Sequence, residues 1–305
     1  MKLTVVIAAF RPDTTGAAID SILRQSHAAF ELFVVTQGES HETRRLAEAR
    51  AAADPRVRSL HLSQPGASRA RNAGALAGDG DAVAILDDDC EARADWLAAI
   101  DRYLSDHPEV GVVGGSVIAP PPDRPGFSLC PDVAPTESIY DPGATPGAPP
   151  AGWDFIGCNL AIRRATIERA GLFDPCLGPG TEFPAGEDVD YKLRLEALAI
   201  PMGASPGLVV HHSGGRRYGL RAGLRTSTNY AWGNGGLAGK LTLAGDPRGA
   251  EWLRSTARDC LRGPLSRPWA LPKDLNRLRN YAAAYRRCLA GYRIEGAGLA
   301  PRSDA

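Results

Sequence analysis

Three consecutive carboxylates, Asp87, Asp88 and Asp89, follow the apolar run at residues 83–86. A buried strand cannot hold three adjacent carboxylates without partners, so the strand must end here and deliver them to an opening. Hard divalent ions such as Mn²⁺ and Mg²⁺ bind carboxylate oxygens and keep coordination positions for substrate phosphates. The triplet alone favours two interpretations equally: a metal that carries a phosphorylated ligand, or a solvated acidic turn that caps the following helix.

The elements before and after the triplet alternate between strand and helix patterns. Apolar, β-branched runs predict the strands, and apolar residues three or four positions apart predict the helices. This alternation is typical of an α/β fold with a mostly parallel sheet covered on both faces, in which ligands bind at the carboxyl ends of the strands. The predicted strands are 2–9, 30–36, 57–62, 82–86 and 110–118, and the predicted helices are 14–25, 41–53, 68–77 and 95–104.

The second half of the chain begins with a stretch rich in proline and glycine, residues 120–150, which cannot continue a helix or a central strand. We expect a long loop that acts either as a lid or acceptor-contacting insertion, or only as a tolerated surface insertion. Strand-like composition returns at 153–162, and a helix is predicted from 187 to about 199. An apolar strand at 208–210 then leads to His211 and His212.

Glu187 and Asp188 open the helix predicted after the glycine-rich loop. The helix dipole and the exposed amides of a first turn favour acidic residues there without any catalytic role. The pair of histidines after an apolar strand, in a chain with only six His, makes a metal or phosphate contact a serious alternative to a structural role.

Composition limits the class of protein. The chain has 305 residues, of which 44% are hydrophobic, enough for a packed core. The six cysteines show neither a CxxC pair nor metal-ligand spacing, which argues against a disulfide framework or structural zinc and fits a reducing compartment. The apolar run at the start is too short for a signal peptide, and no apolar run of membrane-spanning length occurs, so we expect a cytoplasmic protein.

The formal net charge of zero hides an asymmetry between an acidic body and a basic region at 213–305. Within that region, residues 274–292 place apolar side chains three and four positions apart with arginines around them, which predicts an amphipathic basic helix. Such a helix either packs on the domain or forms an oligomer contact, or it lies on an anionic membrane at the inner face of the cell membrane, near a lipid-linked acceptor.

Six segments together resemble the inverting nucleotide-sugar glycosyltransferases of family 2, which have the GT-A fold. The resemblance covers residues 3–212, so it implies a GT-A domain at 1–212 with the insertion at 120–150, followed by a basic, mainly helical extension at 213–305. Each segment alone is weak, but their order is specific. They are TVVIAAFR (4–11), QPGASRARNAG (64–74), AILDDDC (84–90), GCNLAIRRATIERAGLFD (157–174), GEDVDYKLR (186–194) and VVHH (209–212).

The resemblance also implies roles for individual residues. Asp188 falls on the catalytic base, and its neighbour Glu187 falls on an acceptor-binding position that also belongs to the catalytic pair. Asp87 and Asp89 match the DxD motif, whose carboxylates face the ribose and the metal. The implied nucleotide-sugar contacts are Ala8, Ala9, Phe10, Arg11, Thr36, Gln37, Arg71, Asp87 and Asp88; the implied acceptor contacts are Trp153, Gly157, Asn159 and Glu187; and the implied ligands of Mn²⁺ or Mg²⁺ are Asp87, Asp89, His211 and His212.

One position departs from the family pattern. Where the family commonly has an Asp after the second strand to bind the nucleobase, this chain has Thr36 and Gln37. This departure weakens the usual grounds for a uridine nucleotide, although Thr36 or Gln37 could still bond a pyrimidine edge. A UDP-sugar is kept as the default donor, with dTDP-rhamnose next and a GDP-sugar as a further alternative. The expected reaction is transfer of a sugar with inversion to a hydroxyl of a glycan, glycolipid or similar acceptor, as in polysaccharide biosynthesis.

Other classes of protein fit less well. A nucleotide-binding Rossmann dehydrogenase needs GxGxxG after the first strand, and a P-loop enzyme needs GxxxxGK[ST]; the chain has neither. We expect no nucleic-acid partner. The competing hypothesis is a catalytically inactive binding or scaffolding protein that keeps the GT-A sheet, and the retention of Asp87, Asp89 and Asp188 argues against it.

Overall fold

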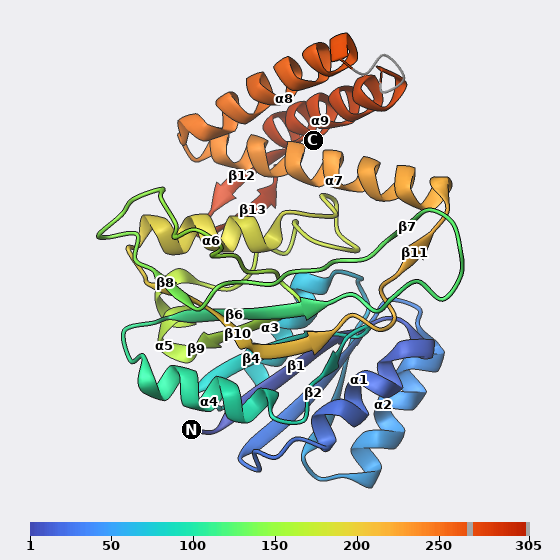
Figure 1. Ribbon diagram of the computed structural model, residues 1–305, viewed down its shortest axis with the longest axis vertical. Helices are drawn as coiled ribbons and strands as arrows, with labels where there is room; N and C mark the ends of the chain where they lie inside the picture. Colours follow the sequence, from blue (N-terminus) through green and yellow to red (C-terminus); the bar gives the residue numbers. More distant parts are fainter. Residues whose placement is uncertain (267–270, 303–305) are drawn as a thin grey trace. The chain divides into compact units, whose positions relative to one another are not determined.

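The structure is a computed structural model that describes residues 1–266 and 271–302 (Figure 1). The chain divides into two compact units. The first comprises Met1–Leu172 and Tyr191–Arg217, and the second comprises Phe173–Asp190 and Tyr218–Ala305. Each unit is described separately below.

The first unit is built on a sheet whose strands run in the order β3-β2-β1-β4-β9-β6-β10-β5, with β8 paired to β10. The pairs β1–β2, β2–β3, β1–β4 and β6–β10 are parallel, whereas β9 is antiparallel to both of its neighbours. The carboxyl ends of β4 and β10 therefore lie at the same edge as the start of β9. The strands are β1 (Leu3–Ala9), β2 (Phe30–Gln37), β3 (Val57–Leu62), β4 (Ala82–Asp87), β5 (Glu91–Ala92), β6 (Val112–Ile118), β8 (Ser138–Tyr140), β9 (Asn159–Arg163) and β10 (Met202–His211).

Helices cover both faces of this sheet, as the alternating pattern predicts. One core includes Val5 and Ile7 of β1 together with residues of α1, α2 and α4. On the other face, Gly74 of α3 approaches Val6 so closely that a Cβ there would lie 2.5 Å from the valine Cγ1. The helices of this unit are α1 (Pro12–Leu23), α2 (His41–Ala53), α3 (Ala67–Ala77), α4 (Trp96–Asp106) and α5 (Arg164–Ala170), and α6 (Glu187–Ala197) contributes its part from Tyr191 on.

The proline-rich segment 120–150 is more ordered than a simple loop. Its strand β8 pairs antiparallel with β10, with Tyr140 opposite Met202, and Tyr140 is fully buried. The tyrosine ring also lies edge-on to Trp153, with ring centroids 5.3 Å apart. The segment is thus anchored on the sheet at its middle. Earlier in it, β7 (Ser128–Leu129) forms a separate two-stranded sheet with β11 (Arg217–Tyr218).

The second unit combines the start of α6 with the C-terminal region. Its elements are α7 (Leu220–Leu243), α8 (Pro247–Ser266), α9 (Leu271–Gly291) and the hairpin of β12 (Tyr292–Glu295) and β13 (Gly298–Pro301). The sequence predicts a single domain boundary between residues 212 and 213, and the division into units differs from it. The first unit ends at Arg217, and Phe173–Asp190 belongs to the second unit together with the C-terminal region.

A buried cation explains why Phe173–Asp190 groups with the C-terminal helices. Lys240 of α7 is only 5% exposed, and its Nζ lies 2.9 Å from Asp174 Oδ2 and 2.6 Å from Asp190 Oδ1. It also donates to the carbonyl oxygen of Ala297 at 2.7 Å, while the Leu299 amide donates to Asp174 Oδ2. One lysine therefore joins α7, the β12–β13 hairpin and the first turn of α6.

Glycines allow α7 to approach its neighbours closely. A Cβ at Gly239 would lie 2.6 Å from Cys288 Cβ on α9, and a Cβ at Gly233 would lie 2.5 Å from the Ala185 backbone nitrogen. A Cβ at Gly235 would lie 2.3 Å from the Tyr281 carbonyl oxygen, and a Cβ at Gly236 would lie 2.2 Å from Phe183 Cδ1. At these four positions α7 has no room for a side chain.

The predicted basic helix exists, as α9, but it ends at Gly291, and Tyr292 begins β12. Tyr281, Ala284 and Cys288 are buried, and α9 contacts α7 and α8. Part of its apolar face therefore packs within the second unit, against the other helices of the C-terminal region, so docking on the predicted GT-A domain and contact with a membrane both stay predictions. No helix among residues 1–266 and 271–302 is long and apolar enough to cross a membrane.

The Lys240 cluster yields a stability prediction. Lys240→Met should lower the free energy of unfolding by about 3–5 kcal/mol, because it leaves two buried carboxylates without their cation. Urea unfolding followed by circular dichroism measures the loss. Arg287→Met is the matched control in the same unit, since it breaks an exposed ion pair with Glu182 and should cost about 1 kcal/mol or less. Equal effects of the two substitutions would contradict the prediction.

Candidate active site

The three aspartates lie where β4 ends. Asp87 is the last residue of β4 and is paired in register with Ala8 of β1, so the triplet faces the loop that follows β1. The chain then turns, and the Cys90 amide donates to the Asp87 carbonyl oxygen at 3.1 Å. The acidic run thus ends a buried strand at the edge where ligands bind in parallel sheets.

Asp88 binds the first loop rather than facing outward. Its Oδ2 accepts hydrogen bonds from the backbone amides of Phe10 and Arg11 at 2.6 and 2.7 Å, and its Oδ1 pairs with the Arg11 guanidinium. Burial raises the pKa of Asp88, and these contacts oppose the increase without cancelling it. With 1% exposure, Asp88 positions the loop, so the structure gives no support to its predicted direct contact with the nucleotide sugar.

Asp89 lies between two cationic or potentially cationic groups. Its Oδ2 is 3.0 Å from the Arg11 guanidinium, and its Oδ1 is 3.6 Å from His212 Nε2. Desolvation lowers the pKa of Arg11, but the three aspartates outweigh it, so the net shift is upward. Arg11 therefore balances the charge of a nearly buried carboxylate pair.

Asp87 is the most open member of the triplet, with 30% of its side chain exposed. Its Oδ1 accepts from Arg71 Nη2 at 2.8 Å, and Arg71 is itself only 2% exposed. Desolvation opposes ionisation of Asp87, yet the Arg71 charge holds the pKa of this carboxyl below its ordinary value. The structure therefore brings together five predicted residues: Asp87, Asp88, Asp89, Arg11 and Arg71.

The other predicted nucleotide contacts differ in accessibility. Phe10 is 53% exposed at the end of β1, whereas Ala8 and Ala9 are buried in the strand. Thr36 is fully buried and donates to the Leu60 carbonyl oxygen, and Gln37 Oε1 accepts from the Gly66 amide at 2.5 Å. Both polar side chains at the end of β2 thus hold neighbouring segments of their own fold.

The predicted acceptor contacts in the first unit are buried. Asn159 is fully buried; its Oδ1 accepts from Trp96 Nε1, and its Nδ2 donates to the carbonyl oxygens of Ser116 and Leu208. These bonds lie inside the fold, so the structure gives no support to the predicted contact with an acceptor. Trp153, whose Nε1 donates to the Met202 carbonyl oxygen, and Gly157 are also buried.

The two histidines at the end of β10 separate. His211 is exposed and paired in register with Glu91 of β5, whereas His212 is 4% exposed and faces Asp89. A strand places successive side chains on opposite sides, which explains the separation. Of the two, the structure brings only His212 to the carboxylates.

Glu187 and Asp188 belong to the second unit, at the first turn of α6. Glu187 is 7% exposed, whereas Asp188 is partly exposed, and its Oδ1 accepts from the Val189 amide at 2.8 Å. The next acidic residue, Asp190, binds Lys240. The turn thus holds one carboxylate in an ion pair and leaves Asp188 accessible.

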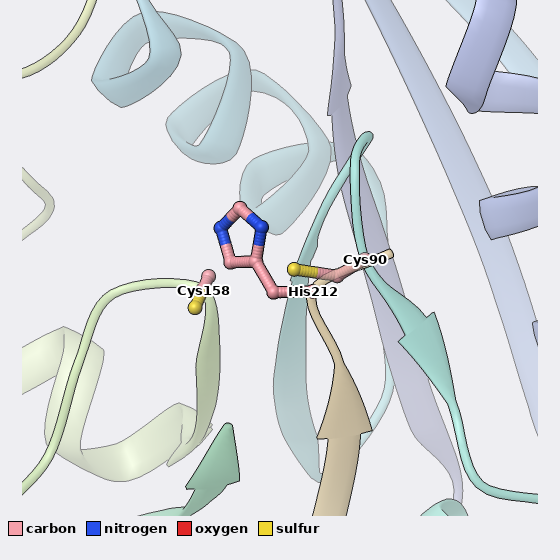
Figure 2. Close-up of side chains that lie close together, drawn as sticks. All are labelled: Cys90, Cys158 and His212. Carbon is pink, nitrogen blue, oxygen red and sulfur yellow. The ribbon is translucent and has the colours of Figure 1, made fainter. Parts of the chain in front are cut away.

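Sequence reasoning missed Cys90 and Cys158. Both are buried, and their sulfur atoms lie within 4.8 Å of one another and of a ring nitrogen of His212 (Figure 2). Their positions at the end of β4 and immediately before β9 bring them together, since these strands are neighbours. Spacing along the chain gives no signal for such a cluster.

The chain matches known proteins of one kind. The family model described as glycosyl transferase family 2 matches residues 4–169. A glucosyl-dolichyl phosphate glucuronosyltransferase of Haloferax volcanii is 31% identical over 121 residues, 39% of each chain. An uncharacterized glycosyltransferase of Escherichia coli, YibD, is 33% identical over 91 residues, 30% of this chain and 26% of the relative. The chain thus matches less than half the length of these curated relatives.

Solved structures share the fold. The mannosyltransferase PcManGT from Pyrobaculum calidifontis, in complex with GDP-Man and Mn²⁺, aligns with a TM-score of 0.58 and 18% identity over 94% of this chain and 87% of its own. Residues 1–349 of TarS from S. aureus, in complex with UDP-GlcNAc, align with a TM-score of 0.58 and 15% identity over 99% of this chain and 97% of theirs. With the family model matching more than half of its residues, the chain belongs to glycosyl transferase family 2 and has the GT-A fold.

Proposed function

We propose that this glycosyltransferase moves a sugar from a nucleoside diphosphate donor to a hydroxyl group of a glycan or lipid-linked acceptor, with inversion and with a divalent cation. The observation that carries the proposal is the cluster at the end of β4. Its three carboxylates meet two arginines, Arg11 and Arg71, at a strand edge. Such a mixed cluster can serve both a cation and the phosphates that the cation binds.

The oxygen ligands at this edge fit a hard cation. Asp87 and Asp89 offer carboxylate oxygens, and Asp87 is partly exposed. Carboxylate oxygens suit Mg²⁺ and Mn²⁺. When bound, the cation would stabilise the charge of the departing diphosphate as a Lewis acid. The protein's own contribution here is Arg71, whose charge holds the pKa of Asp87 below its ordinary value.

Two solved structures of this fold contain a nucleotide sugar. PcManGT was solved with GDP-Man and TarS with UDP-GlcNAc, so both nucleotides occur among proteins of this fold. We keep a UDP-sugar as the default donor and a GDP-sugar or dTDP-rhamnose as alternatives. Because Thr36 and Gln37 are engaged inside the fold, we assign base recognition to exposed groups such as Phe10 rather than to these two.

Asp188 is the proposed general base. It is a partly exposed acidic residue in the first turn of α6. Proton removal from the acceptor hydroxyl requires such an accessible basic group. Glu187, its more buried neighbour, would orient the acceptor.

A lipid-linked acceptor would place the enzyme at a membrane surface. The Haloferax volcanii relative is named for a dolichyl phosphate substrate. In the second unit, Leu261 of α8 and Leu271 and Leu275 of α9 are exposed. Arg277, two residues after Leu275, is exposed as well. We propose that these apolar and basic side chains contact anionic lipid, while the buried face of α9 stays in the helical packing.

The metal hypothesis predicts the behaviour of Asp89. Asp89→Asn should reduce Mn²⁺-dependent binding of UDP or GDP by at least about tenfold, because the lost carboxylate charge is a main attraction for the cation. Isothermal titration with and without chelator measures this. His211→Ala should weaken binding less, and Asp79→Asn, which changes an exposed carboxylate paired with Lys2, is the control. Unchanged metal dependence in Asp89→Asn would remove this role.

The base hypothesis predicts that Asp188→Asn folds and binds donor normally but loses at least about a hundredfold in turnover, since a general base contributes about 10²–10⁴-fold. Transfer is measured by mass spectrometry at saturating donor. Asp274→Asn, which changes another first-turn carboxylate, in α9, is the matched control. Turnover within a few-fold of the parent would move the role to Glu187 or Asp190.

The membrane hypothesis is tested by co-sedimentation with vesicles. The protein should bind vesicles containing phosphatidylglycerol at low salt and should dissociate as salt screens the arginines. Leu271→Ser with Leu275→Ser should reduce binding several-fold, because apolar burial adds to the electrostatic attraction. If the parent protein ignores anionic vesicles at low salt, the helices serve only packing within the protein.

A further inference from the structure

Two thiols and an imidazole form a buried cluster beside the acidic triplet. Cys90 is 1% exposed, Cys158 4% and His212 4%, and both cysteines are free thiols. One ligand atom from each residue lies within 4.8 Å of the other two. Figure 2 shows the imidazole between the two cysteines. The residues come from three segments: the turn after β4, the residue before β9 and the residue after β10.

The hydrogen bonding of His212 leaves one nitrogen without a partner. Nε2 lies 3.6 Å from Asp89 Oδ1. Nδ1 is buried without a hydrogen-bond partner among the described residues. A buried polar atom without a partner is costly, so this imidazole lacks a partner that the described residues do not supply.

The backbone packs closely against this side of the ring. A Cβ at Gly215 would lie 1.6 Å from Nδ1 and from Cε1 of His212, so only glycine lets the turn pass here. The Gly215 amide also donates to the His212 carbonyl oxygen at 3.3 Å, which holds the turn in place. The ring is therefore held in position by the turn that follows it.

We propose that Cys90, Cys158 and the imidazole of His212 bind a thiophilic divalent cation of the Zn²⁺ type, separate in chemistry from the hard cation of glycosyl transfer. Two thiolates and an imidazole select Zn²⁺ over Mg²⁺ or Mn²⁺. Tetrahedral zinc with these ligands places the ligand atoms about 3.3–3.8 Å apart, which small side-chain movements from the present cluster would reach. Asp89 would orient the ring from behind, as carboxylates commonly do for zinc-bound histidines.

The thiols lose their protons when the cation binds. A hydrogen bond with Cys158 and burial hold the pKa of Cys90 well above its ordinary value. Binding releases the two thiol protons to solvent as two metal–sulfur bonds form, and no oxidant or reductant is involved.

Cobalt titration of the full chain tests the proposal. Co²⁺ is added under a phosphine reductant in excess Mg²⁺, and the expected result is a thiolate-to-cobalt charge-transfer band that saturates at one ion per chain and disappears on addition of Zn²⁺. Cys158→Ser should weaken Co²⁺ binding by at least about tenfold, since it removes a ligand. The matched control is Cys260→Ser, which changes a buried cysteine in α8 and should leave the band unchanged.

A second measurement uses the unaltered protein and does not depend on how a variant folds. Alkylation followed by peptide mapping should show that Zn²⁺ slows modification of Cys90 and Cys158 at least about tenfold, with no change at Cys260 or Cys288. A missing thiolate band, an equal band in Cys158→Ser, or alkylation rates that ignore Zn²⁺ would each overturn the proposal. None of these readouts depends on transferase activity, so they test the thiol site independently of the proposed reaction.

Discussion

The first unit depends on how charge is balanced at the end of β4. Three adjacent carboxylates close to a core would repel one another and lose hydration, and two arginines compensate for both effects. Arg11, from the loop after β1, serves Asp88 and Asp89, and Arg71, from α3, serves Asp87. Because a buried charge is tolerated only with a partner, the loop and the helix are fixed relative to the strand. The same ion pairs that stabilise the edge therefore shape the binding site.

Much of the sheet could be predicted because its cause is local in sequence. The apolar runs of β1 and β2 are buried at every position, as expected for central parallel strands, and the helices between them follow the expected order. The antiparallel insertion of β9 between β4 and β6, and the pairing of β8 with β10, could not be predicted, since both depend on contacts between distant segments. The division of the chain was also missed, because Lys240 reaches Asp174 and Asp190 only in three dimensions.

Residue types predicted the candidate site better than they predicted the role of each residue. The triplet, Arg11 and Arg71 do converge, because strand ends and the following loops share one edge of the sheet. Asn159 and Gln37 were assigned to ligands, although their amides satisfy buried groups of the fold. A polar residue in a motif can serve either purpose, and only its burial and partners distinguish them. The Cys90–Cys158–His212 cluster had no sequence signal, because no short spacing connects its members.

The glycines of α7 have a consequence for how the second unit folds. Each glycine in a helix interior raises the free energy of the helical state by about 1 kcal/mol relative to alanine. Helix α7 carries four of them within two turns: Gly233, Gly235, Gly236 and Gly239. The same glycines permit the close approach of α9 and of Phe183. The segment is therefore a poor helix alone and a stable one only against its neighbours. Folding of this unit should be cooperative: α7 acquires its helical hydrogen bonds at the same step at which α9 docks, not before.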